Sequence, residues 1–72
     1  MKNLTALQFQ ELLRVINCLS VKDFIEIFDE GQAHYWAKFC EQGAFKFICY
    51  LDSGNVKALY DYSLLKMERQ NG

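Results

Sequence analysis

His34 is the only histidine of the chain and the first candidate for nucleophilic or acid–base chemistry, because a nearby imidazole can activate a cysteine thiol. The nearest cysteine on the face that we predict for His34 is Cys40, six residues along the same predicted strand. A strand rises about 3.3 Å per residue, so the two side chains are expected roughly 20 Å apart, beyond hydrogen-bonding reach. We therefore predict no Cys–His dyad and interpret His34 as a surface residue of a sheet.

The cysteines and carboxylates do not form a recognisable metal motif. Cys18, Cys40 and Cys49 are separated by 22 and 9 residues, unlike the closely spaced pairs of zinc sites. Three carboxylates share one side of a predicted helix, a pattern typical of a solvated face or, alternatively, of an acidic stripe for a basic partner: Asp23, Glu26 and Glu30. The sequence predicts no enzyme activity, no metal and no cofactor.

The composition predicts one small folded domain spanning residues 1–72. Half of the residues (51%) are hydrophobic and 15% are aromatic, which argues against disorder. A net charge of −1 argues against a protein built mainly to hold phosphate backbones. Polar residues interrupt the first segment, and no apolar run reaches the length of a membrane span, so we expect no signal peptide and no membrane association. We therefore predict a cytoplasmic location. The odd number of cysteines agrees with reduced thiols in that compartment.

Two helix starts can be recognised from their capping residues. Thr5 followed by Gln8 forms the pattern of a capping box, in which each residue's side chain accepts a hydrogen bond from the other's backbone N–H. The same pattern recurs with Ser20 and Asp23. We expect helices over about 6–16 and 21–30, joined as an αα-hairpin and ended at Gly31.

The next residues predict an antiparallel sheet. A three-residue loop, 41–43, with glycine in its last position suits a turn closed by a left-handed residue. A second loop, 52–55, suits a type I turn. The expected strands are 34–40, 44–51 and 56–62. The predicted fold class is α+β: an αα-hairpin on one face of a three-stranded antiparallel β-meander, followed by a short C-terminal helix (ααβββα).

Two alternatives replace strands with helices. The C-terminal helix could start near Val56, which would remove the third strand and leave ααββα. A helix-turn-helix with Gly31 in its turn and 33–41 as its second helix is also available. We disfavour it, because it places Ile27 where a small residue is normally wanted and because 34–36 are poor helix formers.

The predicted register collects an apolar row with a polar rim on the outer face of the sheet. Such a row resembles the centre and rim of a protein interface. Its predicted partner-binding residues are Trp36, Ile48, Leu59, Tyr50, Lys38, Lys46 and His34. The alternative is that the C-terminal residues Leu64, Leu65 and Met67 fold back and bury this row within one chain.

These observations favour a non-catalytic protein-binding module, a small regulator or inhibitor that docks on a macromolecular partner. Regulators encoded by phages and plasmids are often of this size. The second hypothesis is single-stranded nucleic-acid binding, with bases stacked on Trp36 and Tyr50. The third is a homo-oligomeric structural protein. The expected partner is a protein or a second copy of the chain, and a homo-oligomer is expected because the core is small.

Overall fold

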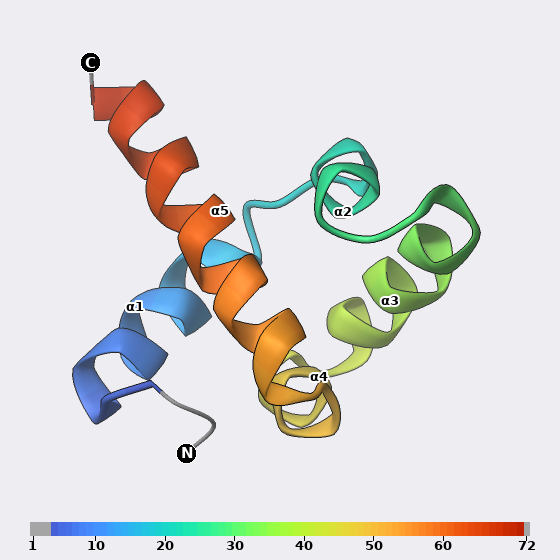
Figure 1. The fold of residues 1–72 in the computed structure, drawn as a ribbon, viewed down its shortest axis with the longest axis horizontal. Helices are drawn as coiled ribbons and strands as arrows, with labels where there is room; N and C mark the ends of the chain where they lie inside the picture. Colours follow the sequence, from blue (N-terminus) through green and yellow to red (C-terminus); the bar gives the residue numbers. More distant parts are fainter. Residues whose placement is uncertain (1–3, 72) are drawn as a thin grey trace.

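The computed structural model describes residues 4–71, and the surroundings of the side chains of 4–69. This part of the chain folds into five helices without a strand (Figure 1). The helices are α1 (Ala6–Ile16), α2 (Val21–Ile27), α3 (Glu30–Gln42), α4 (Ala44–Tyr50) and α5 (Ser53–Asn71). The predicted α+β class is therefore wrong, since the three segments expected as strands lie in α3, α4 and α5.

The first two helices begin where the capping pattern predicts. The Gln8 N–H donates to Thr5 Oγ1 at 3.1 Å, and the Thr5 N–H donates to Gln8 Oε1 at 2.9 Å. Ser20 and Asp23 form the second capping box, with the Ser20 N–H donating to Asp23 Oδ2 at 2.7 Å. Helix α1 has its predicted bounds, whereas α2 ends at Ile27, three residues before the predicted end.

Two further aspartates cap helices in segments for which the sequence predicts other structures. Asp29 accepts the Gln32 N–H at 2.8 Å and starts α3, so that Gly31 lies in the first turn of this helix instead of stopping α2. Asp52 accepts the Asn55 N–H at 2.8 Å just before α5. A short acceptor side chain that satisfies the first N–H groups of a helix explains both starts.

Gly43 separates α3 from α4 without forming the predicted hairpin turn. Its φ of 177° is extended backbone, whereas the predicted turn required a left-handed residue. Its N–H donates to the carbonyl groups of Phe39 and Cys40, and its own carbonyl accepts the Phe47 N–H at 3.0 Å. One residue thus ends a helix and starts the next, so the chain changes direction between two helices.

The long helix α5 crosses the molecule diagonally, with α1 on one side and α2 and α3 on the other (Figure 1). Helix α4 lies near the start of α5, and α3 contacts both α2 and α4. Every helix contributes to one buried core, formed by Leu12, Ile16, Phe24, Phe28, Ala33, Cys40, Phe47, Ile48, Leu51, Val56, Leu59 and Tyr60.

Asp23 joins α2 to α5 through part-buried polar contacts. It accepts the Tyr62 hydroxyl at 2.7 Å and pairs with the Lys66 ammonium at 2.5 Å. Burial alone would raise the pKa of Asp23, but the hydrogen bonds from Lys66, from the Ser20 N–H and from Tyr62 outweigh it and hold this pKa well below its usual range. Asp23 is 7% exposed, so the predicted solvated stripe keeps only Glu26 and Glu30 at the surface.

Candidate docking surface

Four aromatic side chains meet on the outer side of α3 and α4. We call this set the aromatic patch: Tyr35, Trp36, Phe39 and Tyr50. The ring centroids lie 5.0 Å apart for Tyr35–Trp36, 6.1 Å for Trp36–Tyr50 and 5.4 Å for Phe39–Tyr50. Tyr35 is 59% exposed and Tyr50 is 68% exposed, while the two inner rings are half-buried. The solvent-exposed part of the patch therefore consists of two tyrosines that pack on the rings of Trp36 and Phe39.

Helical spacing and the core together position the aromatic patch. Tyr35 and Phe39 are four residues apart, so they lie above one another on one side of α3. Beneath them Phe47 of α4 is fully buried, with its ring 5.8 Å from Trp36 and 6.1 Å from Phe39. The inner rings of the patch therefore pack directly on a core residue.

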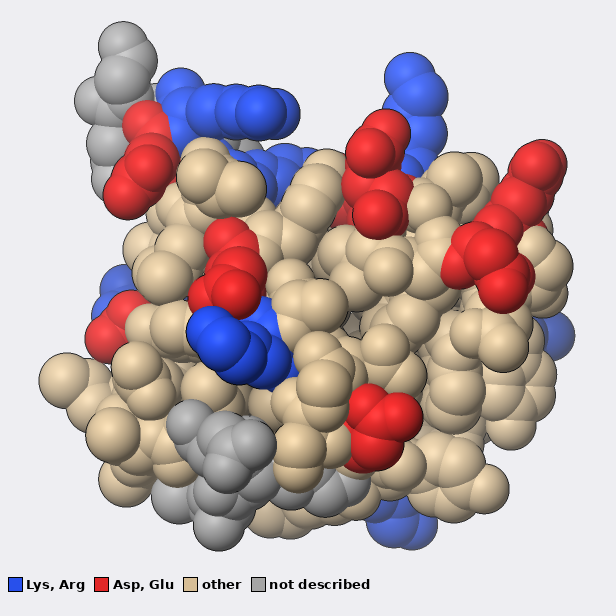
Figure 2. Space-filling view, in the orientation of Figure 1, with Lys and Arg blue, Asp and Glu red and all other residues tan. Residues whose placement is uncertain are grey.

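The charges near the aromatic patch are few and of mixed sign. Lys46 precedes Tyr50 by one turn of α4 and therefore shares its side of the helix. Asp29 and Glu30 stand at the beginning of α3, and acidic side chains there would repel a phosphate backbone. This position argues against DNA binding by α3, because a recognition helix contacts DNA through its first residues. Figure 2 likewise shows basic and acidic side chains interspersed on one face of the molecule.

The structure brings together only part of the predicted partner-binding set. Trp36 and Tyr50 lie in the aromatic patch, with Lys46 beside them. Ile48 and Leu59 belong to the buried core, 1% and 0% exposed, so they offer no surface to a partner. The row across three strands does not form, because its members lie on three helices.

The other two predicted site residues lie elsewhere on α3. His34 and Lys38 line a hollow between α3 and the segment that joins α1 to α2. The C-terminal residues do not fold back as a separate tail: Leu64 packs against the core from within α5, and Leu65 is 54% exposed.

The sequence reading missed Tyr35 and Phe39 as surface residues. In the predicted sheet both point toward the helices, because side chains alternate along a strand. In a helix they lie one turn apart, and their four-residue spacing was the available signal.

Metal-binding side chains do not converge in the described residues. Within 4–71 no group of three His, Cys, Asp or Glu side chains is placed to hold a metal ion. Cys40 is buried, and burial raises the pKa of its thiol, which disfavours the reactive thiolate. Among the described helices, none combines the length and apolar character needed to cross a membrane.

The described fold and surface define a small helical domain that carries an exposed aromatic patch. Comparisons with protein-family models, with curated protein sequences and with solved structures find no match to this chain.

Proposed function

We propose that the chain is a non-catalytic protein-binding module whose aromatic patch docks on a partner protein, in the manner of a small regulator or inhibitor. The observation that carries this proposal is the contiguous set of rings with two exposed tyrosines, Tyr35 and Tyr50. We also propose a cytoplasmic location, which rests on the odd cysteine number and the buried thiol of Cys40.

Aromatic side chains suit this role because they bury a large area for few rotatable bonds. Tyr and Trp are the residue types most enriched among those that dominate binding energy, especially at the centre of an interface. Trp36 and Phe39 are already fixed against Phe47, so little side-chain freedom is lost on association. Lys46 supplies a charged group for the rim, where water still reaches it.

The test compares two exposed aromatic surfaces of the chain. Tyr35→Ala combined with Tyr50→Ala removes the exposed part of the aromatic patch, whereas Phe45→Ala removes a 61% exposed ring on another side of α4. A photo-crosslinker placed at position 46 captures the partner from lysate of the source cells. We expect one partner protein whose capture is abolished by the double substitution and unchanged by the control.

Three outcomes would contradict the proposal. Capture that is equally strong with the double variant would place the interface elsewhere. Salt-dependent retention on single-stranded oligonucleotides that disappears with the tyrosines would indicate base stacking instead. A light-scattering mass of a defined oligomer that becomes monomeric in the double variant, with no other protein captured, would indicate the structural homo-oligomer.

A further inference from the structure

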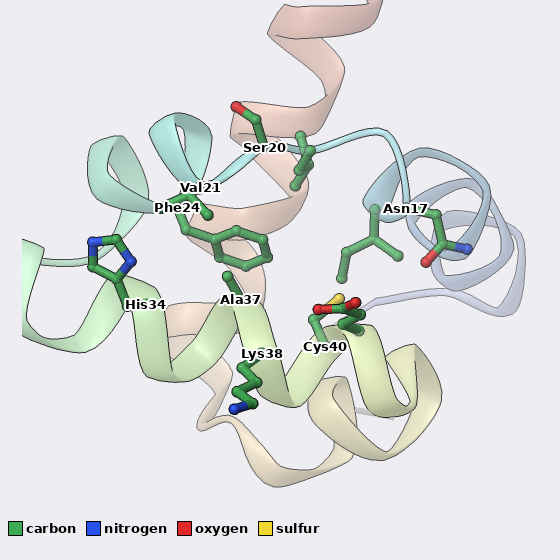
Figure 3. Close-up of a pocket in the computed structure, with 11 residues that line it drawn as sticks. Asn17, Ser20, Val21, Phe24, His34, Ala37, Lys38 and Cys40 are labelled. Atoms are coloured by element: carbon green, nitrogen blue, oxygen red, sulfur yellow. The ribbon is translucent and has the colours of Figure 1, made fainter.

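A hollow of about 460 Å³ lies beside α3, between this helix, α2 and the segment that joins α1 to α2. Its volume falls in the range of sites that hold small molecules. Figure 3 shows His34 at one end and Asn17 and Cys40 at the other, with Phe24 and Ala37 between them. The hollow is therefore elongated along α3, with an apolar middle.

The lining of the hollow changes character from floor to rim. Phe24 and Cys40, 2% and 5% exposed, belong to the core and form part of its floor. The Ser20 hydroxyl in the lining is bonded to Asp23. The other polar lining residues are exposed and, among the described residues, make no side-chain hydrogen bond or ion pair: Asn17, His34, Lys38 and Glu41. These polar groups remain available to a ligand.

The polar residues of α3 are ordered along the helix axis. His34 and Glu41 are seven residues apart, which corresponds to about 10 Å at 1.5 Å per residue. Lys38 lies between them and carries a positive charge on a flexible stem. Glu41 stands in the last turn of α3, where the unpaired carbonyl groups add to its negative charge. Along the rim, His34 and Lys38 therefore form an anion-binding part, and Glu41, one turn beyond Lys38, forms a cation-binding part at the end of α3.

We propose that this hollow binds a short zwitterionic peptide with an apolar side chain in its middle. An extended chain spans about 3.3–3.6 Å per residue, so three residues cover the distance along α3. The peptide's terminal ammonium meets Glu41 and the Asn17 carbonyl oxygen, and its terminal carboxylate meets Lys38 and His34. The middle side chain rests between Val21, which is 40% exposed, and the half-buried Ala37. This site lies on the side of α3 away from Tyr35 and Phe39, and its existence does not depend on the aromatic patch.

The probe is the tripeptide Ala-Leu-Ala, titrated into the ¹⁵N-labelled full chain and followed by NMR. We expect saturable shifts of the backbone signals of 17–21 and 34–41. N-acetylation and C-terminal amidation of the peptide should each weaken binding about tenfold, since each removes one charged hydrogen-bonding group. Glu41→Gln and Lys38→Gln should weaken it similarly, while Lys46→Gln on α4 should leave it unchanged.

Two results would overturn this assignment. The first is that the signals of 17–21 and 34–41 do not respond up to the solubility limit of the peptide. The second is that the blocked peptides bind as well as the free one, because the charged ends would then play no part. Lys38 and Glu41 are exposed on a helix, so their variants should keep the wild-type circular dichroism, and loss of binding can be separated from loss of fold.

Discussion

The contact between α2 and α5 depends on the Asp23 carboxylate, and Asp23→Asn removes its charge with little change of shape. The carboxylate completes the second capping box and accepts a charge-assisted hydrogen bond from Lys66. A cap contributes about 1 kcal/mol and a hydrogen bond to a charged group about 2 kcal/mol. We therefore expect Asp23→Asn to lower the free energy of unfolding by about 3 kcal/mol, out of about 4–11 kcal/mol for a domain of this size.

The matched control is Asp61→Asn, which removes the carboxylate of another aspartate–lysine pair. Asp61 lies 3.3 Å from Lys57 on the surface of α5, with side chains 55% and 67% exposed. Pairs of this kind on a helix surface contribute roughly 0.3–0.5 kcal/mol. Urea denaturation at pH 7, followed by circular dichroism, should therefore separate the two variants clearly.

Lowering the pH should erase most of the difference between the wild type and Asp23→Asn. The folded-state pKa of Asp23 lies below its unfolded value of about 3.9, so its contribution is complete above that pH and is lost as the pH falls. The loss is about 1.4 kcal/mol per pH unit, hence about 2 kcal/mol at pH 2.5. The wild-type advantage should shrink from about 3 to about 1 kcal/mol.

Either of two results would refute this reasoning about Asp23. If Asp23→Asn costs no more than Asp61→Asn, the buried contacts do not hold α2 against α5. If the wild-type advantage is the same at pH 7 and pH 2.5, the Asp23 carboxylate is not stabilised in its charged form in the folded state.

Three further predictions concern the caps, the core and the alkaline limit. Thr5→Ala and Ser20→Ala should each lower the free energy of unfolding by about 1 kcal/mol, measured as a lower denaturant midpoint; unchanged midpoints would mean that these hydroxyl groups do not cap. Phe47→Ala should cost about 3–5 kcal/mol because the ring is fully buried, whereas Phe45→Ala should cost less than about 1 kcal/mol; equal costs would contradict the core assignment. The hydrogen bond to the Asp23 carboxylate, together with desolvation, raises the pKa of Tyr62 to about 12. The free energy of unfolding of the wild type should therefore fall between pH 10 and 12, because the unfolded state loses this proton first. Denaturation at these pH values should show a smaller fall for Tyr62→Phe.

The sequence was sufficient to predict the two capping boxes. It was not sufficient to decide between strand and helix for the segments of α3, α4 and α5. Thr5 and Ser20 mark the beginnings of their helices because each bonds to a partner three residues later in the chain. A contact over so short a distance can be recognised in the sequence. Asp29 and Asp52 follow the same rule, but position 29 was predicted within the second helix and position 52 within a type I turn, and both predictions were wrong.

The α3 segment shows why the strand prediction was wrong. Its buried positions, Ala33, Cys40 and the half-buried Trp36 and Ala37 between them, repeat with helical spacing. The neighbouring aromatic residues favour strands, and their alternation gave a competing pattern of equal length. Packing of Trp36 against the buried Phe28 and Phe47 accompanies the helical form, and this contact with other helices is not part of the local sequence pattern. For 56–62 the helical alternative near Val56 agrees with α5.

The aromatic residues that favoured the wrong strand prediction also form the exposed part of the aromatic patch. Core formation explains Phe24, Phe28 and Phe47, which are buried, but it does not explain Tyr35 and Tyr50, which remain mostly exposed. Single exposed apolar side chains are common on folded proteins and need no special role. Tyr35 and Tyr50 differ from such single side chains because each contacts rings that themselves pack on the core. A partner that binds there would therefore order few additional side chains. Under the proposed function, substitutions of Tyr35 and Tyr50 should therefore change binding while leaving the fold intact.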